Sequence, residues 1–117
     1  MINDLKKQFT ETFGGSEEGL RVFASPGRVN LIGEHTDYNG GPVFPAALTM
    51  NTTIVARKRD DDVIRLKATD LDILVEAKIC DLEKYKDTLK WGDYQLGVAL
   101  ELLNAGYDIV GCDLLYH

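Results

Sequence analysis

The sequence predicts a single α+β domain in which a mixed β-sheet carries helices on one face. Two segments with helical apolar spacing, residues 3–13 and 92–104, enclose several segments rich in β-forming residues, and one more alternating segment follows the second helix. The chain has 117 residues, of which 44% are hydrophobic and 27% are charged, an ordinary composition for one globular domain. No repeat, low-complexity segment or linker divides residues 1–117, so we expect one domain.

The first third of the chain predicts a short helix followed by two β-rich segments. In residues 3–13, Leu5, Phe9 and Phe13 lie four residues apart, and two glycines end the pattern. The segments LRVFAS and RVNLIG then flank a Pro-Gly pair at residues 26–27. Because Pro-Gly is a common turn pair, we expect a hairpin or bend between two strands there.

The middle of the chain predicts a β-hairpin with an acidic tip and one further strand. Residues 47–59 are rich in Thr, Ile and Val, and three consecutive aspartates interrupt them before VIRLKAT alternates apolar and polar residues. DILVEAKI indicates the next strand. The polar stretch CDLEKYKDTLK has little periodicity, so it is expected to form a loop or one helical turn.

The last third predicts a mostly buried helix and a final strand. Tyr94, Val98 and Leu102 recur every four residues within 92–104, and three more leucines widen this apolar face. DIVGCDLLYH then alternates as a strand. A last apolar strand leaves either a sheet edge or a strand without its neighbour, so we expect it to pair with a second copy of the chain or to exchange elements with it.

Charge and composition exclude several kinds of partner. The net charge of −6 provides no positive field for nucleic acid. No apolar stretch approaches the roughly 20 residues of a membrane span, and the amino terminus does not resemble a signal peptide. We therefore expect a cytoplasmic protein that binds neither nucleic acid nor membranes. Cys80 and Cys112 lie in apolar runs without metal-ligand spacing, which predicts buried free thiols.

A dense group of polar residues follows the segment VNLIG. Glu34, His35 and Asp37 lie within four positions, and the glycines around them permit a tight loop. Two carboxylates and an imidazole suit a polyhydroxylated ligand such as a sugar. The same residue types also close turns or ligate divalent cations, and spacing alone leaves these alternatives open. Arg28, taken alone, is more typical of an exposed strand arginine or a structural ion pair than of a functional residue.

The run SPGRVNLIGEHTDYNGG, residues 25–41, resembles the galactokinase signature, and the resemblance continues through GGPVFPAAL, WGDY and CDLLYH. It implies the amino-terminal part of a GHMP small-molecule kinase domain, with the ribosomal-protein-like α+β fold of that superfamily, incomplete at the carboxyl end. The implied reaction of the full-length protein transfers the γ-phosphoryl group of ATP to the C1 hydroxyl of galactose. A galactokinase-like sugar sensor without catalytic activity and an N-acetylgalactosamine kinase are the alternatives.

The resemblance also implies roles for individual residues. Glu34, His35, Thr36 and Asp37 match the positions that contact the sugar, with Asp37 facing the ring hydroxyls that distinguish galactose from glucose and Glu34 facing the exocyclic hydroxyl. Arg28 matches a transition-state stabiliser. Its permanently charged guanidinium suits this role, because it can stabilise negative charge on a transferring phosphoryl group.

The groups that handle the nucleotide are expected mostly outside these residues. Trp91 is implied to lie near the adenine, although a core anchor is an equal alternative. In the family, the strand equivalent to CDLLYH leads into a glycine- and serine-rich loop that holds the phosphates. The ligands of ATP and Mg²⁺ and the catalytic base are therefore expected beyond His117. We expect no metal site within the 117 residues and no kinase activity from them alone.

Overall fold

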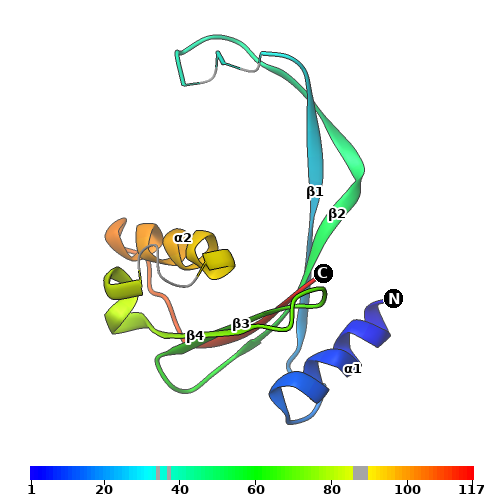
Figure 1. Cartoon of the computed structure of the whole chain (residues 1–117), viewed down its shortest axis with the longest axis vertical. Coiled ribbons are helices and arrows are strands. Elements are labelled where there is room, and N and C mark those ends of the chain that lie inside the picture. The colour runs from blue at the N-terminus through cyan, green and yellow to red at the C-terminus, as the bar shows by residue number, and fades with distance from the viewer. Residues whose placement is uncertain (34, 37, 86–89) are drawn as a thin grey trace.

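The computed structural model describes residues 1–33, 35–36, 38–85 and 90–117. These residues form one five-stranded sheet with helices packed against it (Figure 1). In chain order, the elements are α1 (Ile2–Phe13), β1 (Arg21–Ile32), β2 (Phe44–Lys58), β3 (Val63–Ala68), β4 (Leu74–Lys78), the 3-10 helices η1 (Ile79–Tyr85) and η2 (Lys90–Gly92), α2 (Asp93–Asn104) and β5 (Cys112–Tyr116). The mixed sheet of the expected α+β class is confirmed, and both α-helices lie where their apolar spacing predicts them.

The last strand lies inside the sheet, which corrects the expectation that it forms an edge. The strand order is β1-β2-β5-β3-β4, and β5 is antiparallel to β2 and parallel to β3. Both of its backbone edges are therefore hydrogen-bonded within the chain. The expectation that this strand pairs with a second copy is wrong, because the strand has no free edge to offer.

The position of β5 also corrects the predicted β2–β3 hairpin. The aspartates at 60–62 do connect β2 to β3, but Ile64 of β3 faces Cys112 of β5, and Ala56 of β2 faces Leu114. A strand from the end of the sequence thus separates two strands that are consecutive in the chain. Alternation along a strand predicts which face each side chain takes, and it carries no information about the neighbouring strand.

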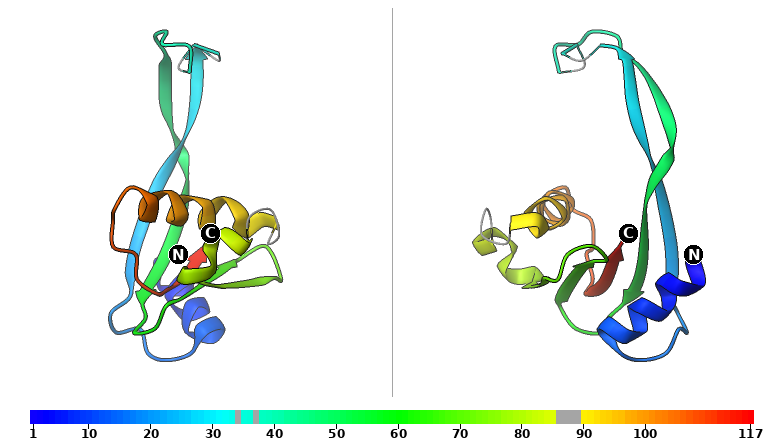
Figure 2. Two further views of the ribbon diagram at one scale, coloured as in Figure 1. Left: turned by 90° about the vertical axis from the view of Figure 1, so that its left-hand side faces the viewer. Right: turned by 45° about the vertical axis from the view of Figure 1, so that its right-hand side comes forward.

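The Pro-Gly pair lies inside a continuous strand instead of at a hairpin. β1 runs from Arg21 to Ile32 and pairs with β2, with a register shift between Pro26 and Arg28 that marks a β-bulge. A proline is tolerated there because β1 is an edge strand and a bulge needs one ladder hydrogen bond fewer. Beyond the bulge, β1 and β2 continue as a two-stranded arm that leaves the body of the molecule (Figures 1 and 2).

The arm makes the molecule elongated. The radius of gyration is 16.2 Å, whereas a compact chain of this length is expected at about 13 Å. Many large apolar side chains of the arm are exposed, including Leu31 at 62% and Met50 at 73%. The arm is therefore held by the pairing of β1 with β2, and its described residues form no hydrophobic core of their own.

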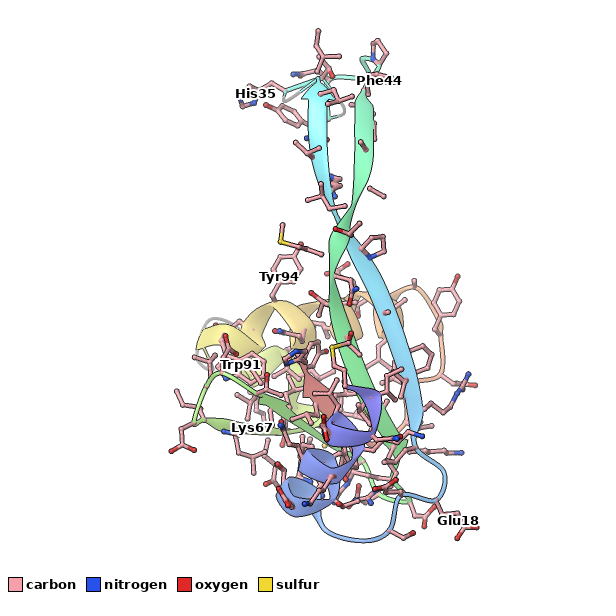
Figure 3. All side chains as sticks on the ribbon, turned by 90° about the vertical axis from the view of Figure 1, so that its right-hand side faces the viewer. Glu18, His35, Phe44, Lys67, Trp91 and Tyr94 are labelled. Carbon is pink, nitrogen blue, oxygen red and sulfur yellow. The ribbon has the colours of Figure 1, made fainter. Side chains whose placement is uncertain are left out.

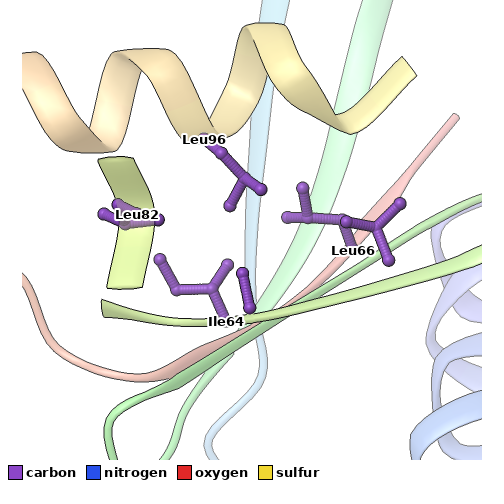
Figure 4. Packing of buried hydrophobic residues seen from close by; sticks show 6 residues of the cluster. Ile64, Leu66, Leu82 and Leu96 are labelled. Atoms are coloured by element: carbon purple, nitrogen blue, oxygen red, sulfur yellow. The ribbon is translucent and has the colours of Figure 1, made fainter. Parts of the chain in front are cut away.

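The two α-helices cover opposite faces of the sheet, which corrects the expectation of helices on one face. α1 packs with Val55 of β2 and Leu115 of β5 through its buried residues Leu5, Phe9 and Phe13. α2 and η1 cover the other face, where the core consists of Ile64, Leu66, Val75, Ala77, Leu82 and Leu96 (Figure 4). Because successive residues of a strand point to opposite faces, the adjacent leucines of β5 contribute to different cores.

α2 is rotated relative to the sequence-based expectation. Its buried residue is Leu96, whereas Tyr94 is 84% exposed and Val98 is 52% exposed. The prediction of a mostly buried helix with Tyr94, Val98 and Leu102 on its buried face is therefore wrong. The leucines that were expected only to widen that face, Leu96, Leu100 and Leu103, pack against the core.

A buried carboxylate joins three neighbouring arginines on the α1 side of the sheet. Asp113 of β5 is 1% exposed and accepts hydrogen bonds from Arg65 at 2.6 and 2.8 Å, from Arg59 at 3.0 Å and from Arg57 at 3.2 Å. Burial alone would raise the pKa of Asp113, but the hydrogen bonds and charges of the arginines outweigh it and hold the pKa below its usual range. Charges on β2, β3 and β5 therefore hold the centre of the sheet together.

Two of these arginines also fasten α1 to the sheet. Arg57 donates to the carbonyl oxygen of Gly14 at 2.8 Å, just past the helix, and its guanidinium lies 5.0 Å from the ring centroid of Phe9. Arg65 stacks over Phe13 at the same 5.0 Å separation. The charged cluster and the α1 core thus form one unit.

The two cysteines are free thiols. Cys112 is half-buried and Cys80 is exposed. The prediction of two buried thiols is therefore wrong for Cys80, which lies in η1. Desolvation and neighbouring carboxylates still raise its pKa above the usual thiol value. None of the described helices is long and apolar enough to span a bilayer.

Candidate functional site

The described residues of the predicted sugar site, His35 and Thr36, lie at the end of the arm, in the loop of residues 33–43 that joins β1 to β2 (Figure 3). Gly33 begins this loop with a φ of +107°, and a Cβ atom there would lie 3.0 Å from the Cα of Val43. A residue with a side chain would be strained at this φ and crowded by the opposite strand. Gly33 therefore permits the sharp turn that starts the loop.

Thr36 holds the loop together through its hydroxyl and its backbone. Its hydroxyl donates to the carbonyl oxygen of Pro42 at 2.7 Å and also lies 3.2 Å from the carbonyl oxygen of Gly33. Its own carbonyl oxygen accepts from the backbone N–H groups of Asn39 at 3.2 Å and Gly41 at 2.5 Å. The single hydroxyl proton of Thr36 is thus used inside the loop, and only the oxygen lone pairs remain for a ligand.

His35 is exposed at the tip of the arm and is held from two sides. Its Nδ1 lies 2.6 Å from the hydroxyl oxygen of Tyr38, and the two rings meet edge to face. The side-chain amide of Asn39 donates to the backbone carbonyl of His35 at 2.8 Å. Glu34 and Asp37, the two carboxylates of the predicted sugar site, lie outside the described residues.

Arg28 lies lower on the arm, directly after the bulge in β1. It is exposed and borders a hollow of about 390 Å³ lined also by Ser25, Pro26, Gly27, Leu48, Met50, Asn51 and Thr52. Within the described part of the chain, its guanidinium has no hydrogen bond or ion pair. From Arg28 to the end of β1 at Ile32, about 13 Å of extended strand intervenes. The described contacts therefore do not bring Arg28 and His35 together.

Trp91 is part of the domain core. It lies half-buried in η2, packs against the α2 side of the sheet and meets Tyr116 edge to face, with centroids 6.2 Å apart. The neighbouring Gly92 approaches Val75 so closely that a Cβ atom would lie 2.8 Å from that side chain. The indole Nε1 of Trp91 and the amide oxygen of Gln95 are buried without a hydrogen-bond partner in the described residues.

An apolar surface that the sequence assigned to the core lies open on α2. Tyr94, Val98 and Leu102 face outward around a hollow of about 560 Å³, and Tyr94 points into the space beside the arm (Figure 3). The four-residue spacing detects this stripe, but periodicity cannot tell a stripe that faces the core from one that faces outward. Tyr38 was also missed as a partner of His35, although its spacing of three residues is typical of contacts within a turn.

Comparisons with known proteins confirm the resemblance seen in the sequence. A family model described as the galactokinase galactose-binding signature matches residues 7–58, which include β1, the loop and β2. Galactokinase from Clostridium tetani is 46% identical over 114 residues, which are 97% of this chain and 28% of that protein. Galactokinase from Bacillus subtilis is 43% identical over 119 residues, which are 99% of this chain and 30% of that protein.

Solved structures show the same fold. The crystal structure of Lactococcus lactis galactokinase complexed with galactose matches 98% of this chain and 30% of its own, with a TM-score of 0.89 and 42% identity. A mevalonate kinase from Methanococcus jannaschii matches with a TM-score of 0.66 at 18% identity, which shows a shared fold alone. The chain spans about three tenths of the length of these galactokinases. It belongs to the galactokinase family and corresponds to the amino-terminal region of these proteins.

Proposed function

We propose that the full-length protein transfers the γ-phosphoryl group of ATP to the C1 hydroxyl of galactose, and that this chain supplies one wall of the galactose site. The observation that carries the proposal is the galactose-binding signature, which spans the whole arm and its tip loop. The loop fixes its own backbone through Thr36, so it can hold polar side chains in place before a ligand arrives.

The sugar contacts are proposed for Glu34, His35 and Asp37. Carboxylates accept hydrogen bonds from neighbouring sugar hydroxyls, and the exposed imidazole of His35 adds one more polar group at the same loop. The hydroxyl of Thr36 has fewer hydrogen bonds to offer a sugar, because it already donates its proton to the carbonyl oxygen of Pro42. It can only accept a hydrogen bond from the sugar, and its main contribution is to hold the loop.

Arg28 is proposed to stabilise the transferring phosphoryl group. Its guanidinium is exposed and carries no carboxylate partner among the described residues, so its charge is available to a ligand. A permanently charged arginine close to a transferring phosphoryl group stabilises the negative charge of the transition state. By contrast, the three arginines around Asp113 are already paired and are not candidates for this role.

The nucleotide side of the reaction rests on family membership. Galactokinases use ATP and Mg²⁺, and most of the groups that hold them would lie outside these 117 residues. Within the chain, Trp91 is the proposed neighbour of the nucleotide. A buried N–H group normally meets a hydrogen-bond acceptor, and the indole N–H of Trp91 has none in the described residues, which supports a further polar partner at this place.

A chimeric enzyme tests the proposed reaction. The chain would replace the aligned region of Lactococcus lactis galactokinase, to which it is 42% identical. We expect galactose-dependent ATP consumption by the chimera, and a fall in kcat of about 100-fold or more for Arg28→Ala. Arg21→Ala is the matched control, because Arg21 is an exposed arginine of the same strand whose contact is the ring of Phe23. Equal activity of both variants would refute the role of Arg28.

The same chimera separates the alternative functions. Activity on N-acetylgalactosamine that exceeds activity on galactose would identify the acetamido sugar as the substrate. Galactose binding without ATP consumption would indicate a sugar sensor. The 117 residues alone, measured beside the chimera, are expected to consume no ATP.

A further inference from the structure

The pair formed by His35 and Tyr38 limits what the imidazole can offer a ligand. A neutral imidazole has one ring nitrogen that donates a hydrogen bond and one that accepts. In this loop, Nδ1 is occupied by the hydroxyl of Tyr38 at 2.6 Å, and Nε2 has no hydrogen-bond partner among the described residues. Which of the two nitrogens carries the proton therefore decides whether His35 donates to a sugar or accepts from it.

The geometry of the pair favours the phenol as the donor. Hydrogen bonds from N–H groups to oxygen usually span about 2.7–3.2 Å, whereas O–H donors reach shorter distances. A phenol is also a much stronger acid than the N–H of a neutral imidazole, so the phenol gives the better hydrogen bond as donor. The 2.6 Å contact thus fits a Tyr38 hydroxyl that donates to an unprotonated Nδ1.

We propose that Tyr38 is a positioning residue that keeps the neutral His35 imidazole protonated on Nε2, so that His35 presents a hydrogen-bond donor to a sugar hydroxyl. The backbone supports this arrangement, because Asn39 donates to the carbonyl of His35 and to that of Thr36. A hydroxyl that accepts from Nε2 keeps its own proton for a carboxylate. A donor on Nε2 of His35 together with a carboxylate acceptor favours a ligand group that both accepts and donates a hydrogen bond, as a hydroxyl does.

The consequence for sugar binding rests on the proposed function, but the protonation state of the ring does not. It is measurable on the 117-residue chain, which contains only two histidines. The second, His117, has its Nδ1 3.0 Å from the hydroxyl oxygen of Thr69 and so provides an internal reference in the body of the domain. Its signals report whether a variant keeps the fold.

The experiment is a long-range ¹H–¹⁵N correlation spectrum of the ¹⁵N-labelled chain at about pH 8.5, where an ordinary imidazole is neutral. We expect an unprotonated Nδ1 and a protonated Nε2 for His35. Tyr38→Phe should move both nitrogen shifts towards those of a free imidazole and leave His117 unchanged. Thr69→Val should move the nitrogen shifts of His117 and leave those of His35 unchanged. A proton on Nδ1 in the wild type, or unchanged His35 shifts in Tyr38→Phe, would overturn the proposal.

A galactose titration of the chimeric enzyme described above, with and without Tyr38→Phe, tests the consequence. Loss of one hydrogen bond of ordinary strength weakens affinity about 3- to 10-fold, and we expect this loss for Tyr38→Phe. Tyr107→Phe is the control, because Tyr107 is an exposed tyrosine outside the loop. If the chimera binds no galactose, the proposed function is refuted, while the ring spectra of the 117-residue chain still decide the role of Tyr38.

Discussion

The cluster around Asp113 gives the sharpest test of how this sheet is held together. Asp113→Asn keeps the size of the side chain and removes its charge. The carboxylate accepts four hydrogen bonds from three arginines, two at each oxygen. Asparagine retains one acceptor oxygen and places an NH₂ group against the donors that met the other oxygen. Two charge-assisted hydrogen bonds are therefore lost outright.

The expected loss of stability is about 3 kcal/mol. Hydrogen bonds to charged groups contribute about 1.5–3 kcal/mol each, which gives about 3–6 kcal/mol for two. The arginine side chains are 21–22% exposed, so water compensates part of this loss and the lower end applies. Removal of one partner from a buried ion pair costs a similar amount, about 3–5 kcal/mol.

Urea unfolding measures this change. The fluorescence of Trp91, the single tryptophan, and far-ultraviolet circular dichroism report on the same domain. Asp72→Asn is the control, because Asp72 is fully exposed and its carboxylate oxygen lies 3.5 Å from Nζ of Lys67. Loss of this exposed ion pair should leave the free energy of unfolding almost unchanged. A change below about 1 kcal/mol for Asp113→Asn would show that the cluster contributes no net stability, which would refute the reasoning.

Three further predictions test the charges, the loop and the helix. The pKa of Asp113 is lower in the folded than in the unfolded chain, so its stabilising contribution is present above the unfolded pKa of about 3.9 and is lost as the pH falls through the folded pKa. In Asp113→Asn the free energy of unfolding should therefore fall less steeply as the pH is lowered below about 4, which circular dichroism measures. Thr36→Val should speed amide hydrogen exchange in the loop of residues 33–43, with a local loss of about 1–2 kcal/mol, and leave global unfolding unchanged, since the loop lies at the arm tip. Gly97→Ala should raise the free energy of unfolding by about 1 kcal/mol, because the new Cβ would meet open space and alanine favours the helix α2. Gly92→Ala should lower the free energy of unfolding by about 1–3 kcal/mol, because the new Cβ would clash with Val75 of β4. Urea unfolding must therefore show changes of opposite sign for the two variants.

Local patterns in the sequence predicted several elements correctly because their causes are local. Apolar residues at four-residue spacing and following glycines placed α1 and α2 to within one residue of their observed limits. The signature at residues 25–41 predicted the family, which the comparisons confirm. Its glycines also predicted a tight loop, and Gly33 with its positive φ begins one.

Contacts between distant parts of the chain were not predictable in this way. Nothing in the alternation of CDLLYH indicates that β5 inserts between β2 and β3, because backbone hydrogen bonds are the same whatever the side chains. The Tyr94–Val98–Leu102 stripe was assigned to the core for a related reason. Apolar spacing shows that a helix has an apolar face, but the packing of the neighbouring elements decides whether that face is buried or exposed.

The sequence by itself determined the class of fold, the positions of the two α-helices, the family and the residues to consider for a sugar site. The tertiary structure alone decided that the last strand is central, that helices cover both faces, that Asp113 pairs with three arginines and that Thr36 uses its proton within the loop. The physical reason is that propensity and periodicity act over a few residues, whereas strand order, burial of charge and hydrogen-bond partners depend on groups that meet only when the chain is folded.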